Sequence, residues 1–296
     1  MAMRAGHQFQ LLSRILACPY CWAPLAVDGD ALRCTSTACA RMLPIMDDVI
    51  LVEDRNRNRS FFDGTFGLMS ETTHQPGTRK VFYMPQSKWL EASLDEYLRR
   101  GRGDAVLVDV GCGPSVPYTR RPRNVLVGVD LSYEAVRRNY DVDVRVYGAA
   151  SHLPFGDRSI DAIICFYLLH HIVAESVAEG ERCIREAFVE FGRVLKHDGR
   201  IYAFEVILGH PMFLLQRLAW NTLRNVYPSL DMFFWSDRAL RELSLECLPR
   251  GTELRRHVFK ASMWATFPFI FTLPRLKLPR FLYPFEICGY EWRVSC

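Results

Sequence analysis

A glycine-rich turn after an apolar run is the first group of residues that could do chemistry. Residues 106–110 are apolar except for Asp109, and the chain then runs into Gly111, Cys112 and Gly113. The apolar run predicts a parallel strand that is buried on both faces. The two glycines allow the backbone to approach a ligand closely, so this turn is a candidate binding loop.

A second apolar run, residues 125–129, ends in Asp130. In dinucleotide-type folds, an acidic residue at the tip of the second strand accepts hydrogen bonds from ribose hydroxyls. A lone Gly-x-Gly is also found as a simple tight turn in α/β proteins. Here the strand, the turn, the second strand and the acid occur in order, which favours a cofactor that contains ribose.

Two histidines follow the predicted fourth strand, residues 161–165, within the sequence Phe166-Tyr-Leu-Leu-His-His. Ligands of open α/β sheets bind beyond the carboxyl ends of the strands, so His170 and His171 are expected near a bound ligand. Either imidazole could act as a general base near neutral pH. The alternative is that one histidine caps the next helix and the other packs.

Together with Leu153-Pro-Phe-Gly-Asp-Arg-Ser-Ile-Asp161, these motifs resemble the class I S-adenosylmethionine-dependent methyltransferases. They are most similar to the type 11 branch that includes the ubiquinone and menaquinone methyltransferases, in which "LPF-x-D-x-S-[FI]-D" precedes the fourth strand and "LHH" follows it. The resemblance spans residues 80–210. It implies an α/β fold with a Rossmann-like seven-stranded sheet, mostly parallel with the last strand antiparallel, and an enzyme that converts S-adenosylmethionine to S-adenosylhomocysteine.

The resemblance also implies where the cofactor binds. The implied contacts are Asp109, Gly111, Cys112, Gly113, Asp130, Leu131, Ala150, Ser151 and Phe166, with His170 and His171 near the methyl group. Two positions depart from the family pattern, because Ser115 replaces a frequent third glycine and Ala149 replaces a common Asp that contacts adenine. Backbone atoms near Ala149 and Ala150 could still reach adenine, and Ser151 or His152 could compensate.

Residues 116–124 contain two prolines and are too short for a full helix, so the usual first helix is predicted to be shortened or replaced by a loop. A pyrophosphate-containing cofactor would lose a helix N-terminus, but S-adenosylmethionine has no phosphate. The arginines at 120, 121 and 123 are expected to lie in a solvated loop, the alternative being a phosphate or substrate contact.

Four of the ten cysteines lie in the first 40 residues. Cys18 and Cys21 form a Cys-x-x-Cys pair, and Cys34 and Cys39 form a second, wider pair. Two close pairs separated by a short hairpin suit tetrahedral thiolate coordination of zinc in a reducing compartment. A site with four cysteine ligands has no open position, so the zinc is expected to be structural; the alternative is a ribbon that has lost its metal.

The segment after Cys39 resembles the "YPI-x-DGI-x-LL" tail of Trm112-like zinc ribbons. We therefore expect a zinc ribbon at residues 1–53, a linker and cofactor-covering segment at 54–79, and a methyltransferase domain at 80–296. The elements predicted in that domain are helices at 86–100, 131–139, 175–196, 210–227 and from 236, and strands at 141–146 near a sheet edge, 200–207, 252–260 and 289–294. Glu205, near a strand tip, is a second candidate for substrate contact.

Two apolar insertions, residues 208–235 and 262–287, are predicted to form lids over the substrate. The second interleaves aromatic residues with Arg275, Lys277 and Arg280, and four prolines prevent one continuous helix. This composition suits contact with a membrane surface or an apolar substrate cover. The alternative is a lid on the sheet edge whose cations face water.

The overall composition is that of an ordinary globular protein, with 49% hydrophobic residues and a formal net charge of +4. Neither a secretory leader nor a membrane-spanning run is recognised, which predicts a cytoplasmic or membrane-peripheral protein. We expect methyl transfer to a small apolar, lipid-like or natural-product acceptor. The alternatives are a methyltransferase for ribosomal or transfer RNA bases that uses the zinc ribbon to contact RNA, and a non-catalytic binding protein.

Overall fold

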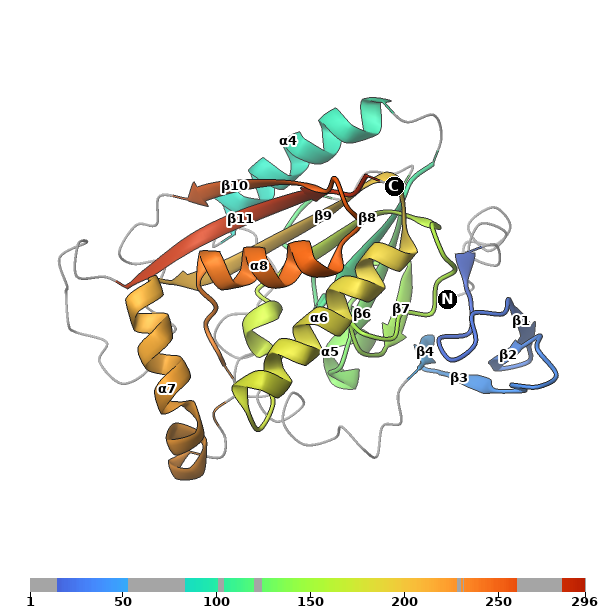
Figure 1. Ribbon diagram of the computed structural model, residues 1–296. Coiled ribbons are helices and arrows are strands. Elements are labelled where there is room, and N and C mark those ends of the chain that lie inside the picture. The colour runs from blue at the N-terminus through green and yellow to red at the C-terminus, as the bar shows by residue number, and fades with distance from the viewer. Residues whose placement is uncertain are drawn as a thin grey trace.

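The fold is organised around one 11-stranded sheet in the order β1-β2-β3-β4-β7-β6-β5-β8-β9-β11-β10, shown in Figure 1. The computed structural model describes residues 15–52, 83–100, 104–119, 124–227, 230, 232–259 and 284–295. The predicted segment 54–79, the arginines at 120–123 and residues 262–283 of the second insertion lie outside the described residues.

The predicted Rossmann-like sheet is confirmed. Its parallel strands are β5 (Val106–Val110), β6 (Val125–Asp130), β7 (Val144–Tyr147), β8 (Ile160–Phe166) and β9 (Leu195–Leu208). The last strand, β11 (Phe285–Arg293), runs antiparallel between β9 and β10 (Glu253–Phe259). All five residues of β5 are buried, as expected for a central strand covered on both faces.

Helices cover both faces of the sheet (Figure 1). On one face lies α4 (Met84–Arg100), whose Leu90 and Leu94 pack against apolar residues of β5, β6 and β8. The other face carries α6 (Val177–Val194) and α8 (Asp237–Cys247), and the remaining helices are α5 (Tyr133–Arg137), α7 (His210–Val226) and the short 3-10 helix η1 (Leu169–His171). A serine begins each of α5, α6 and α8 and accepts a hydrogen bond from the backbone N–H three residues later.

The cysteine-rich segment forms two hairpins. β1 (Leu25–Asp28) pairs with β2 (Ala31–Cys34) across a turn in which Gly29 has φ +60°, and β3 (Met42–Met46) pairs with β4 (Val49–Leu51). β4 in turn pairs in parallel with β7. The sheet therefore extends past the strand that we expected near its edge, because the fully buried Val-Ile-Leu run of β4 covers that strand.

Side chains reinforce this junction. The Tyr133 hydroxyl donates a hydrogen bond to Asp47 Oδ2 at 2.9 Å, and the N–H of Val52 donates to the carbonyl of Tyr147 at 2.9 Å. Arg145 of β7 also lies 3.5 Å from Asp48. The turn between β3 and β4 is thus fixed to α5 and β7.

We expect Tyr133→Phe to lower the free energy of unfolding by about 1 kcal/mol, because it removes one hydrogen bond between the β3–β4 turn and α5. Chemical denaturation followed by circular dichroism measures this change. Tyr227→Phe, at a side chain that is 61% exposed, is the matched control and should change stability far less. Equal effects of the two substitutions would contradict a stabilising role for this contact.

Candidate active site and metal centre

The turn after β5 requires its two glycines. Gly111 has φ +73° and Gly113 has φ +58°, a region that side chains disfavour. A Cβ on Gly111 would lie 2.9 Å from Leu168 Cδ1. The N–H groups of Gly111 and Cys112 both donate to the carbonyl of Val129, at 2.8 and 3.2 Å, which ties the turn to β6.

The Asp130 carboxylate holds this turn at the tip of β6. Its Oδ2 accepts a hydrogen bond from the N–H of Gly113 at 2.8 Å, and its Oδ1 accepts one from the N–H of Ser132 at 2.7 Å. Asp130 thus fixes both the glycine loop and the start of α5.

No helix follows this loop, and acidic side chains accept hydrogen bonds from backbone N–H groups that a helix would otherwise order. Residues 111–119 form turns and bends, and their N–H groups have no helical partners. Instead, the N–H of Val116 donates to Asp141 at 3.1 Å and the N–H of Thr119 donates to Glu91 at 2.7 Å. The Asn139 amide donates to the carbonyl of Gly113 at 2.9 Å. These contacts fix a non-helical loop that contains two prolines.

Asp109 is 1% exposed and accepts a hydrogen bond from the Tyr118 hydroxyl at 2.7 Å. The Phe166 ring packs on Phe204 with 4.3 Å between centroids and on Tyr118 with 5.9 Å. Phe166 therefore lies within an aromatic cluster of the core. The sequence analysis did not single out Tyr118, and only its place in the same short loop as the glycines could have signalled its role.

The remaining candidate cofactor contacts follow β6 and β7. The N–H of Gly148 donates to the backbone carbonyl of Asp130 at 3.1 Å, so the loop after β7 begins beside the tip of β6. Leu131, Ala150 and Ser151 are half-buried, and Ser151 Oγ lies 3.0 Å from Nδ1 of the exposed His152. Cys112 is buried instead, with its sulfur against Gly128, where a Cβ would lie 2.8 Å away.

The two histidines differ in their surroundings. His170 is 1% exposed, and its Nδ1 lies 2.6 Å from Oε2 of Glu205. The other Glu205 oxygen accepts the N–H of Leu169 at 2.6 Å. His170 Nε2 is buried and makes no hydrogen bond within the described residues. His171 is half-buried, with its ring 4.3 Å from the His170 ring.

Glu205 therefore orients His170, rather than presenting a free carboxylate to a substrate as the sequence analysis allowed. The Nδ1 contact favours the tautomer that donates to Glu205 and leaves Nε2 as a proton acceptor. The Phe234 ring stacks on the imidazole at 5.5 Å. The arrangement resembles an acid-oriented imidazole base in apolar surroundings.

Backbone strain occurs at the same strand end. Tyr167 has φ +56°, which is unusual for an aromatic residue. Its N–H donates to the carbonyl of Phe204 at 2.8 Å, and its hydroxyl accepts from the Gln86 amide at 3.0 Å. Burial raises the pKa of Tyr167 well above its usual value, so this hydroxyl stays protonated.

The four N-terminal cysteines form a single cluster. Their Sγ atoms all lie within 4.8 Å of one another, with Cys18 and Cys39 at 3.7 Å and Cys21 and Cys34 at 3.4 Å. A hydrogen bond from the backbone of Ala23 lowers the pKa of Cys21 to about 7, whereas burial raises that of Cys34 to about 12. Four convergent thiols with these separations fit a tetrahedral metal site with no open position.

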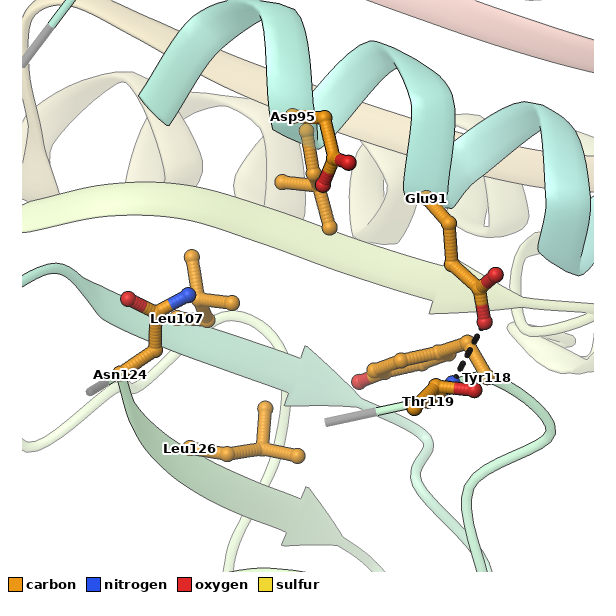
Figure 2. A pocket seen from close by; sticks show the side chains of 8 residues that line it. Glu91, Asp95, Leu107, Tyr118, Thr119, Asn124 and Leu126 are labelled. Carbon is orange, nitrogen blue, oxygen red and sulfur yellow. Dashed lines mark hydrogen bonds between the residues drawn. The ribbon is translucent and has the colours of Figure 1, made fainter. Parts of the chain in front are cut away.

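A small hollow lies on the α4 face of the sheet, beside the end of the glycine loop at Tyr118 and Thr119 (Figure 2). The side chains of α4 face the starts of β5 and β6 across it, and Glu91 holds the N–H of Thr119 at its rim. Its lining residues are Glu91, Leu94, Asp95, Leu107, Tyr118, Thr119, Asn124 and Leu126. Within the part of the chain that the structure describes, no histidine or cysteine lines this hollow, and we assign it no chemistry.

Comparison with known families identifies the central part of the chain. Residues 108–203 match the family model for a methyltransferase domain, which spans the glycine loop, Asp130 and the histidine pair. No curated protein matches the sequence significantly.

The chain is similar to several solved structures, and the first of those described here supports the fold. A protein of Galdieria sulphuraria, described as a proposed sarcosine dimethylglycine methyltransferase, is 17% identical with a TM-score of 0.53, over 81% of this chain and 98% of that one. The YcgJ protein from Bacillus subtilis is 20% identical with a TM-score of 0.43, over 70% and 99% of the two chains. Geranyl diphosphate C-methyltransferase from Streptomyces coelicolor is 15% identical with a TM-score of 0.42, over 75% and 86%.

We expect Asp130→Ala to lower the free energy of unfolding by about 2 kcal/mol, because two backbone N–H groups lose a charged acceptor. Denaturant titration measures this loss. Asp157→Ala is the matched control, since its carboxylate is 68% exposed and its ion pair with Arg193 should contribute little. An Asp130 variant as stable as the wild type would contradict the anchoring role of the carboxylate.

We expect about one zinc ion per chain in protein purified without chelators, because four thiolates form one closed site. Replacing Cys18 and Cys21 together by Ser should abolish binding, as measured by inductively coupled plasma mass spectrometry. The pair Cys183→Ser and Cys247→Ser, outside the cluster, should retain the metal. Metal-free wild-type protein with folded β1–β4 hairpins would refute the site.

Proposed function

We propose that this chain, whose residues 108–203 match the methyltransferase domain, transfers a methyl group from S-adenosylmethionine to a small apolar or lipid-like acceptor. The observation that carries the proposal is the glycine loop held by Asp130 at the carboxyl ends of β5 and β6. That edge of an open α/β sheet is where ligands bind.

The residues present fit this cofactor. Gly111 and Gly113 would leave room for its methionine part, and Asp130 would accept its ribose hydroxyls. Leu131, Ala150 and Ser151 would flank the adenine, with backbone atoms taking the place of the missing acidic side chain at Ala149. Asp109 and Cys112 would hold the loop in place through their hydrogen bonds to Tyr118 and Val129. The bound cofactor would supply an electrophilic methyl group on sulfur.

We assign the role of base to His170 and a structural role to His171. The Nδ1 atom of His170 is bound to Glu205, which leaves the buried Nε2 available to remove a proton from a hydroxyl or an acidic carbon. Glu205 would stabilise the imidazolium that forms. The apolar ring of Phe234 beside it favours an acceptor that is itself apolar.

Zinc is proposed as the metal of the cysteine cluster, in a ribbon of the Trm112-like type, with a structural role only. Its binding would stabilise β1–β4 and, through the β4–β7 pairing, the sheet. The alternative of an RNA substrate is less favoured, because three arginines of the cysteine-rich segment and the adjoining β7 already interact with acidic or aromatic side chains. Arg33 pairs with Asp28, Arg145 with Asp48, and Arg41 lies over the Tyr20 ring at 3.9 Å.

Calorimetric titration with S-adenosylmethionine and S-adenosylhomocysteine tests the proposal. We expect saturable binding at one site, weakened about tenfold or more in Asp130→Ala because ribose contacts are lost. A folded wild-type protein that binds neither compound would favour the non-catalytic alternative. Methyl transfer to RNA but to no apolar small molecule in an acceptor panel would favour the RNA alternative.

With an acceptor in hand, we expect His170→Ala to lower kcat by about 10²–10⁴-fold, because proton removal is lost, while binding of S-adenosylmethionine is retained. Glu205→Gln should also lower kcat, since a neutral amide stabilises the imidazolium less well than a carboxylate does. His171→Ala is the neighbouring control and should retain most activity. A larger loss of kcat in His171→Ala than in His170→Ala would overturn the assignment.

A further inference from the structure

The outward face of α7 is mostly apolar, although Thr222 and Asn225 are exposed on it as well. Its exposed apolar side chains include Leu218 at 84%, Val226 at 63% and Leu215 at 57% exposure, together with Met212, Leu214 and Leu223. The opposite side of the helix carries the buried Phe213 and Trp220. In Figure 1, α7 extends away from the sheet at the lower left.

The spacing of these residues makes one continuous stripe. Positions 211, 214, 215, 218, 222 and 226 follow the three-to-four-residue repeat of a helix face, and none of them is charged. A surface helix of a globular protein ordinarily turns polar residues outward. The outward stripe of α7 is therefore not explained by packing within the described part of the chain.

The sequence of α7 and of the segment that leads back to it carries only positive charge, although Glu181 of α6 pairs with Arg217 on the flank of α7 at 2.6 Å. Residues 209–227 contain no Asp or Glu, and neither do residues 260–284, which carry Lys260, Arg275, Lys277 and Arg280. That basic sequence joins β10 to β11, and it rejoins the described structure beside α7. There, the carbonyl of Pro284 accepts the N–H of Gly209, the residue before α7, at 2.8 Å.

We infer that the outward face of α7 docks on the surface of an anionic phospholipid bilayer. An uncharged apolar stripe, on a helix whose own sequence has no acidic residue and in a chain whose 260–284 sequence is basic, matches the chemistry of an interfacial helix on acidic lipids. Among the helices in the described ranges, none is long and apolar enough to cross a bilayer, so α7 would lie on the surface.

The buried face of α7 connects this surface to the candidate base. Phe213 contacts the Phe233 ring at 6.0 Å between centroids, and the N–H of Phe233 donates to the carbonyl of His170 at 2.8 Å. Docking through the outward face would therefore place α7 and Phe233 between His170 and the lipid. The inference on docking itself does not depend on the methyl-transfer proposal.

Vesicle flotation of the full-length, zinc-loaded protein tests the inference. We expect the wild type to float with vesicles that contain phosphatidylcholine and phosphatidylglycerol, and much less with phosphatidylcholine alone. The double variant Leu215→Glu/Leu218→Glu should bind at least about tenfold more weakly, because two exposed leucines no longer enter the lipid. The matched control is Val189→Glu/Leu245→Glu, at side chains 55% and 44% exposed on other helices, and it should bind like the wild type.

Circular dichroism and unaltered zinc content establish that both double variants are folded. No wild-type flotation with anionic vesicles would overturn the inference, as would equal binding by wild type and the α7 variant. A wild-type dimer that the α7 substitutions convert to monomer, without lipid binding, would assign the face to a second copy of the chain instead. Sedimentation velocity on the same samples distinguishes that outcome.

Discussion

The candidate active site depends on the backbone hydrogen bonds that the carboxylate of Asp130 accepts. This carboxylate accepts them from the glycine loop and from the start of α5, and it lies at the tip of β6 beside the loop that follows β7. In a chain with a full first helix, that helix would fix the glycine loop. Here two prolines remove the helix, and carboxylates of Asp130, Asp141 and Glu91 take over its hydrogen-bonding role.

The cysteine cluster and the candidate cofactor loops belong to one hydrogen-bonded system. The N–H of Val52, just after β4, donates to Tyr147, and the next residue, Gly148, donates to the backbone of Asp130. A Cβ on Gly148 would lie only 3.2 Å from Val52, so the two segments are tightly packed. The cysteine-rich segment is thus continuous with the sheet, and order in one supports order in the other.

The local pattern of apolar and polar residues predicted much of the fold. It did not predict the long-range contacts that define the site. Apolar runs identified β5, β6 and β8, and the helices predicted at 131–139 and from 236 correspond to α5 and α8, because burial and capping depend on residues close in sequence. The Glu205–His170 pair joins residues 35 positions apart, and the Tyr133–Asp47 contact joins residues 86 apart. Such pairs are set by the packing of whole elements, which a single sequence does not encode locally.

The pairing of β4 with β7 also changes how the sheet meets other molecules. An uncovered outer strand in a parallel sheet exposes a row of unpaired N–H and C=O groups that can template aggregation. β4 covers that row on β7, and it is itself held by the segment that carries the cysteines. With the proposed zinc at these cysteines, solubility during synthesis should depend on metal supply, because a chain that cannot complete its N-terminal hairpins leaves β7 as an open edge.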